Sequence, residues 1–192
     1  MSMRDQQRKG LETRERSVVL TFFVVGAILL SAGCGGESSA TQPPPKLDAC
    51  SMLTAADVAA MLGSTAVRTE ADQRGDDSFW MSSCRYQAEG VDGTIAASLM
   101  IRPHHNQSGA EQAYADYDDG LAEQIGESSR LAPVDGPWEK AGWQSFGTSI
   151  GQLAVFQGPY HLIITAPETA SHDQLANCRA LAERALAQLP AP

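Results

Sequence analysis

An apolar run near the N-terminus decides which residues of this 192-residue chain can belong to a folded domain. Residues 18–30 are mostly apolar, follow a charged stretch over residues 4–16, and lead into the small residues 31–33. This order is typical of a cleaved export signal. Because the run is shorter than the about 20 residues that span a hydrocarbon core, a cleaved signal is favoured over a transmembrane helix. We therefore predict that residues 1–33 are removed.

The residues around Cys34 resemble the processing site of bacterial lipoproteins. Leu30-Ser31-Ala32-Gly33-Cys34 is similar to the lipobox, in which a dedicated peptidase cuts before a diacylated cysteine. The match departs from the usual pattern because Ser31 stands where leucine is commonest. Cleavage nearby by an ordinary signal peptidase is the alternative. The resemblance implies a lipid anchor on Cys34, since two or three acyl chains hold a protein stably on a bilayer.

The residues after Cys34 predict where the domain stands. Gly35 is not the aspartate that retains lipoproteins at the inner membrane in Gram-negative sorting. The resemblance thus implies the outer membrane in such a cell, or the outer face of the membrane in a cell that has only one. Residues 34–46 are small, polar and proline-rich, which is typical of a flexible tether. Residues 47–192 are left as a single globular domain.

The net charge limits the class of partner. The whole chain carries a formal charge of −9, and removal of residues 1–33 lowers this charge to −11, because that segment holds five basic and three acidic side chains. A strongly acidic domain argues against a nucleic-acid partner and against direct adhesion to anionic lipid headgroups. Contact with the membrane is therefore assigned to the lipid on Cys34.

Three cysteines remain once Cys34 is assigned to the lipid. They are Cys50, Cys84 and Cys178, and export would place them where disulfides form. Cys178 falls near the middle of the apolar face of the last predicted helix, where a small buried thiol needs no partner. We therefore predict a disulfide between Cys50 and Cys84, with a link from either one to Cys178 as the alternative.

Capping boxes predict where three helices begin. In this motif the side chain of the cap accepts a hydrogen bond from the backbone N–H three residues on, and the side chain of that residue accepts one from the backbone N–H of the cap. We expect the first helix to end at Gly63, the second before Gly126 and the third before Pro190. The three boxes are Thr54 with Asp57, Ser108 with Glu111, and Ser171 with Gln174.

Alternating apolar residues predict strands between these helices, and Gly158-Pro159 predicts the turn between the last two strands. Because short connections favour antiparallel pairing, we predict an α+β domain, in which three helices pack on an antiparallel sheet of about six strands. The predicted order is α-βββ-α-βββ(β)-α. The predicted strands cover residues 65–69, 79–87, 94–102, 129–134, 143–146, 148–157 and 160–165.

A weak internal duplication is one interpretation of this order. At an offset of 63 residues Trp80 aligns with Trp143, Leu99 aligns with Leu162, and the last two capping boxes align with each other. Few other positions agree, so chance similarity between two units of the same type is the alternative.

Residues 48–87 resemble a pattern found in small bacterial envelope lipoproteins. Cys50-Ser51-Met52-Leu53-Thr54 precedes the first helix, and Cys84-Arg85-Tyr86 lies in a later strand. The pattern is similar to that of the actinobacterial lipoproteins of domain of unknown function 3558, which have a Cys-x-Leu-Leu-Thr-like helix start and a Cys-aromatic strand. The resemblance also implies a disulfide between Cys50 and Cys84, although Met52 replaces the usual leucine and Cys178 is additional. It implies no reaction, because that family has no established one.

Motifs for catalysis and for metal or cofactor binding are weak. His104 and His105 are adjacent, which on a strand turns them to opposite faces, so we interpret them as a solvent-facing turn rather than a metal site. The acidic residues within 116–119 fail the spacing of a calcium loop and fit a solvated helix face. No Gly-x-Ser-x-Gly, Ser-x-x-Lys or phosphate-loop motif occurs. We therefore predict no metal, no cofactor and no catalytic residues, and a domain that is not an enzyme.

Aromatic residues give the only signs of recognition. Trp138 and Trp143 flank a predicted turn, where exposed indoles favour binding of a sugar, a peptide or a protein, and core packing is the alternative for each. Tyr114 and Tyr117 on the second helix would line a cleft beside the sheet. The sequence thus favours a lipid-anchored envelope domain that binds a protein or cell-wall partner. A small-molecule binder is the second hypothesis, and a hydrolase assembled from distant segments is the third.

Overall fold

The structure is a computed structural model that describes residues 45–64, 66–88, 95–146 and 150–190. Its strands are β1 (Val67–Gly75), β2 (Trp80–Ala88), β3 (Ile95–Pro103), β4 (Ala132–Pro133), β5 (Lys140–Phe146), β6 (Ile150–Gln157) and β7 (Tyr160–Ala166). Its helices are α1 (Ala49–Met52), α2 (Ala55–Leu62), α3 (Gln107–Ile125) and α4 (Gln174–Leu186), with a 3-10 turn at Glu127–Ser129.

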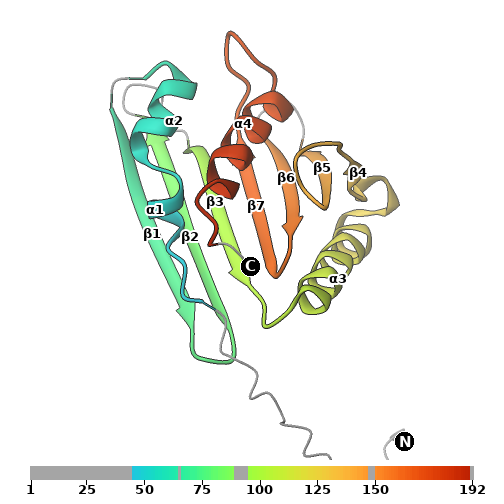
Figure 1. The fold of residues 1–192 in the computed structure, drawn as a ribbon. Helices are drawn as coiled ribbons and strands as arrows, with labels where there is room; N and C mark the ends of the chain where they lie inside the picture. The colour runs from blue at the N-terminus through green and yellow to red at the C-terminus, as the bar shows by residue number, and fades with distance from the viewer. Residues whose placement is uncertain (1–44, 65, 89–94, 147–149, 191–192) are drawn as a thin grey trace, which may run out of the picture. The chain divides into compact units, whose positions relative to one another are not determined.

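The strands form one antiparallel sheet (Figure 1), in the order β1-β2-β3-β7-β6-β5-β4. The central strands are β2, β3, β7, β6 and β5, whereas β1 and β4 lie at the edges. The predicted turn between the last two strands is present, and Gly158 adopts a φ of 54° there, a conformation that glycine favours. The predicted α+β class is confirmed, with seven strands in the described part of the chain instead of about six.

Helices cover the two faces of the sheet unequally. Side chains alternate between the faces along a strand, so Leu153 and Val155 of β6 pack in the core beneath α4, whereas Ala154 and Phe156 pack with α3. The short helices α1 and α2 contact β1, β2 and β3, and share the core beneath α4 (Figure 1). In contrast, α3 packs against β6 and β7 on the opposite face.

The main core lies between the sheet and α1, α2 and α4. Leu99, Leu162 and Leu181 are almost fully buried there. Tyr86 is also buried, and its hydroxyl donates a hydrogen bond to the carbonyl of Leu53, just before α2. This bond ties β2 to the N-terminal helices.

The predicted disulfide is confirmed. Cys50 in α1 is bonded to Cys84 in β2, so the bond fastens the first helical turn to the sheet. Cys178 is a buried free thiol in α4, as predicted, and its Sγ lies 3.6 Å from the carbonyl oxygens of Gly151 and Ile164.

The helix starts show where the capping predictions hold. The box of Thr54 and Asp57 is present at α2, and Gly63 ends this helix at a φ of 63°. The next helix begins after Asn106, and the prediction of Ser108 as its cap is wrong.

The last helix begins after Asp173, and the prediction of Ser171 as its cap is wrong. In both corrected cases an Asx side chain accepts a hydrogen bond from the backbone N–H three residues on, so the helix starts at the residue that makes this capping bond.

Two strand predictions and the proposed duplication also differ from the structure. The strand predicted at 65–69 becomes β1, which extends through the charged residues to Gly75. The strand predicted at 129–134 is reduced to the 3-10 turn and the two-residue β4. The offset aligns β3 with β7 and α3 with α4. However, Trp80 begins β2 whereas Trp143 lies within β5, and α3 and α4 pack on opposite faces, so the two halves are not arranged alike.

Candidate functional site

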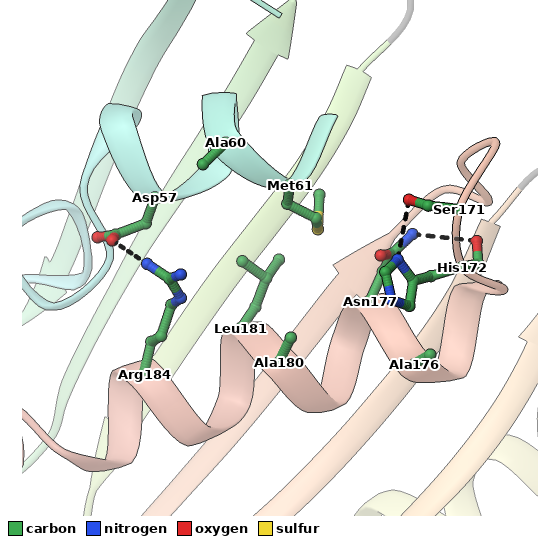
Figure 2. Close-up of a pocket in the computed structure, with 10 residues that line it drawn as sticks. All are labelled: Asp57, Ala60, Met61, Ser171, His172, Ala176, Asn177, Ala180, Leu181 and Arg184. Carbon is green, nitrogen blue, oxygen red and sulfur yellow. Dashed lines mark hydrogen bonds and ion pairs between the residues drawn. The ribbon is translucent and has the colours of Figure 1, made fainter. Parts of the chain in front are cut away.

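A groove lies between α2 and α4 on the side of the sheet that carries both helices (Figure 2). Its volume is about 220 Å³. The groove joins segments that are far apart in sequence, because α2 is near the start of the described chain and α4 is near its end. It has an apolar middle and a polar group of residues at each end, and each of these three parts is built differently.

The middle of the groove is apolar. Met61 from α2 and Leu181 from α4 point toward one another across it (Figure 2). Ala60 and Ala180 are exposed at its sides. Because these alanines end at Cβ, the space between the helices stays open, and a ligand group placed there would touch mainly carbon atoms.

A charged pair closes one end. The guanidinium of Arg184 donates to the carboxylate of Asp57. The same carboxylate accepts the Thr54 hydroxyl at 2.7 Å and the Thr54 backbone N–H at 3.0 Å. The hydrogen bonds from Thr54, and then the interaction with Arg184, hold the pKa of Asp57 below its usual value. The cap of α2 therefore also presents a fixed carboxylate to α4.

The loop before α4 forms the other end. Ser171 and His172 are exposed, and the Nδ1 of His172 lies 2.9 Å from the Oγ of Ser171. Asn177 is 2 % exposed and holds this loop in place through hydrogen bonds of its side chain. Its amide nitrogen donates to the carbonyl of Pro167 at 3.0 Å and to the hydroxyl of Thr169 at 3.2 Å, so the buried amide is well satisfied.

The contact between Ser171 and His172 has the residue types of a nucleophile and a base, but its geometry differs from a catalytic triad. In a triad the serine faces Nε2 and an acid orients the ring through Nδ1. Here the serine itself occupies Nδ1. Within the described ranges, no group of three or more His, Cys, Asp and Glu side chains could hold a metal ion. The groove offers a ligand an apolar middle, the Asp57–Arg184 pair at one end and the Ser171 and His172 side chains at the other.

Tyr114 and Tyr117, which were expected to line a cleft, pack on the other face of the sheet. Both belong to α3, and their rings lie 6.4 and 5.8 Å from the ring of His161 on β7. Burial raises the pKa of each tyrosine to about 12. These side chains join α3 to the sheet, and a role for them in recognition stays a prediction.

The two tryptophans predicted for recognition lie beside the main core. Trp138 and Trp143 are half-buried and pack against it. The indole N–H of Trp138 donates to the carbonyl of Val134 at 2.9 Å, and the guanidinium of Arg179 lies 5.7 Å from the ring centroid. Arg179 is on the flank of α4 opposite the groove, since it falls about 140° from the centre of the groove stripe at 100° per residue. The tryptophans are thus separate from the groove.

The predicted turn at His104 and His105 is only partly as expected. His105 is exposed, but His104 is half-buried and its Nε2 atom is fully buried. His104 lies beside the first turn of α3, against Gly109. The alternation argument separated the two histidines, but it could not show that α3 would begin against His104.

Comparison with protein-family models found no match, and a search of curated proteins found none either. The resemblance of residues 48–87 to envelope lipoproteins therefore stays a prediction. The signal at 1–33 and the lipid on Cys34 fall outside the described residues, as does all but the end of the tether at 34–46. In the described part of the chain, no helix is long and apolar enough to cross a bilayer.

Proposed function

We propose that this chain is a lipid-anchored binding protein of the cell envelope. Its domain binds a short peptide segment of a larger partner in the groove between α2 and α4. The observation that carries the proposal is the apolar middle of the groove between two polar ends. An extended peptide offers the matching pattern, because it places an apolar side chain between backbone groups and polar neighbours that can form hydrogen bonds.

The size of the groove supports a segment of a partner over a complete small molecule. Pockets that enclose drug-sized ligands measure about 300–1,000 Å³, whereas this groove measures about 220 Å³. One or two side chains fill such a space, and the rest of the partner would lie outside it. Arg184 uses one of its nitrogens for Asp57, and its side chain is 54 % exposed, so further N–H donors point to solvent.

Filling the groove is expected to abolish partner capture. Ala180 is exposed on α4, so Ala180→Trp places an indole in the groove without disturbing the core. In crosslinking and pull-down of the full-length chain from intact cells, we expect recovery of the partner to fall at least about tenfold. Ala132→Trp, at an exposed position on the edge strand β4, is the matched control and should leave recovery unchanged.

Two outcomes would contradict the proposed peptide ligand. One is recovery of the same partner by the Ala180→Trp variant, with an unchanged thermal midpoint. The other is a small molecule that co-purifies with the wild-type chain and is lost from this variant, which would favour the small-molecule hypothesis.

Loss of the acylated cysteine is expected to release the chain from the membrane. Because a lipid supplies the predicted anchor and the chain is acidic, Cys34→Ala, made with residues 1–33 replaced by a signal that an ordinary signal peptidase removes, should move it from the membrane fraction to the soluble fraction. Fractionation of cells with immunoblotting measures this change, and Cys178→Ala is the matched control. A Cys34→Ala variant that stays with membranes would contradict the anchor without affecting the groove proposal.

A further inference from the structure

The face of the sheet that carries α3 is covered over only part of its width. Where α3 packs, it covers β6 and β7. On β1, β2 and β3 the residues that alternate with the core positions point away from α1 and α2, and the structure places no described helix over them. We call this surface the open face. It includes Arg68, Arg74, Met81, Arg85, Met100 and Arg102.

The open face has the opposite charge balance to the rest of the chain. The whole sequence has 23 acidic and 14 basic residues, whereas the open face carries four arginines against Glu70 and Asp72. Two of those arginines form ion pairs across it, Arg74 with Asp72 at 2.8 Å and Arg85 with Glu70 at 3.8 Å. The surface thus keeps an excess of positive charge beside half-buried methionines. This composition is typical of a binding surface, because arginine and methionine are enriched at protein interfaces.

The outer side of α3 is its electrostatic complement. Three acidic side chains are exposed there, and at 100° per residue they fall on the side of the helix opposite the buried Tyr114 and Leu121. We call this the acidic side of α3. It consists of Asp116, Asp119 and Glu123, of which Asp119 forms an ion pair with Arg130 at 2.8 Å.

Both surfaces lie on the same face of one sheet, which makes the face self-complementary. The helix α3 projects from the part formed by β6 and β7. The open face, on β1, β2 and β3, leaves room for a second helix. A twofold axis can therefore bring the acidic side of α3 in each copy onto the open face of the other. A helix with its side chains is about 10–12 Å thick, so the two α3 helices would lie side by side in a single layer between the two sheets.

We propose that a second copy of this chain covers the open face, and that two copies pair through this twofold contact. The partner is identified by its charge, since the acidic side of α3 supplies three carboxylates to a surface with excess arginine. Complementary charge of this kind fixes the partner and its register more than it adds affinity, and the half-buried Met81 and Met100 supply the apolar area.

Charge reversal on either surface is expected to prevent pairing. Two differently tagged full-length chains are co-expressed, and recovery of one with the other is measured. Arg74→Glu/Arg85→Glu in both chains, or Asp116→Arg/Glu123→Arg in both chains, should lower co-recovery at least about tenfold. The matched control reverses two exposed acidic residues outside the contact, Glu168→Arg/Glu183→Arg, and should pair like wild type.

Mixing the two reversed chains gives the decisive result. When one chain carries Arg74→Glu/Arg85→Glu and the other carries Asp116→Arg/Glu123→Arg, both contacts of the twofold dimer again join opposite charges, so co-recovery should return. Failure of this rescue, a wild-type chain that does not co-recover itself, or specific recovery of a different acidic protein would each overturn the proposal. Ala180→Trp should leave pairing intact, which separates this inference from the groove proposal.

Discussion

Replacing both Cys50 and Cys84 by alanine is expected to lower the free energy of unfolding by about 3–4 kcal/mol. The disulfide closes a loop with a sequence separation of 34, which contains α2 and β1. Opening this loop gives the unfolded chain more conformations, and the loss grows with loop length. The helix α1 has only four residues and depends on such tertiary links, because isolated short helices are marginal in water.

Urea denaturation of the full-length chain measures this effect. Reductant should lower the midpoint of the wild type, and the double variant should unfold at the same low midpoint with or without reductant. Cys178→Ala is the matched control, because this buried thiol is outside the disulfide and its variant should keep the full response to reductant. A double variant that unfolds together with the oxidised wild type would contradict the prediction.

Local signals in the sequence predicted the parts of the fold that depend on near neighbours. The box of Thr54 and Asp57 marks a helix start because both partners of the motif lie within one turn. The alternation in residues 94–102 predicted β3 to within one residue, since one side of this strand lies in the main core. The disulfide was also predictable, because the helical phase of Cys178 left only two candidates.

The failures have physical reasons. Most of β1 is exposed on both sides, so the strand needs no alternation of apolar residues, and its charged half was missed. The groove could not be found from sequence, since Asp57 and Arg184 are 127 residues apart and no local motif links them. Asp57 was recognised only as a helix cap, and its second role depends on how α4 packs beside α2.

The second large effect concerns pH and arises at His161, on the face of the sheet beneath α3. His161 is 3 % exposed, and its Nε2 has no hydrogen-bond partner in the described residues. Its ring is flanked by Tyr114 and Tyr117 of α3. Burial, and to a lesser extent the nearby charges of His104 and Arg102, lower the pKa of His161 from 6.5 to about 4.

The sign of the pH dependence follows from this lowered pKa. Above pH 6.5 the imidazole is neutral in both the folded and unfolded chains, so its full stabilising effect is present. Between pH 6.5 and about 4 the unfolded chain takes up a proton that folded His161 does not, and the free energy of unfolding therefore falls as the pH falls. At about 1.4 kcal/mol per pH unit of pKa change, the loss from His161 reaches about 3 kcal/mol near pH 4. His104, whose pKa is also lowered to about 4, adds a smaller loss because it is less buried.

Removing the titrating ring should flatten this dependence. Urea midpoints measured from pH 7 to pH 5 are expected to fall steeply for wild type and more gently for His161→Gln, whatever the stability of the variant at pH 7. His172→Gln removes an exposed histidine of the groove and is the matched control, so its slope should equal that of wild type. If His161→Gln kept the wild-type slope, His161 would not be a neutral buried group that acid must charge. If the slope flattens, acid unfolding begins where α3 rests on β7, and hydrogen exchange at pH 5 should then show α3 opening before α4.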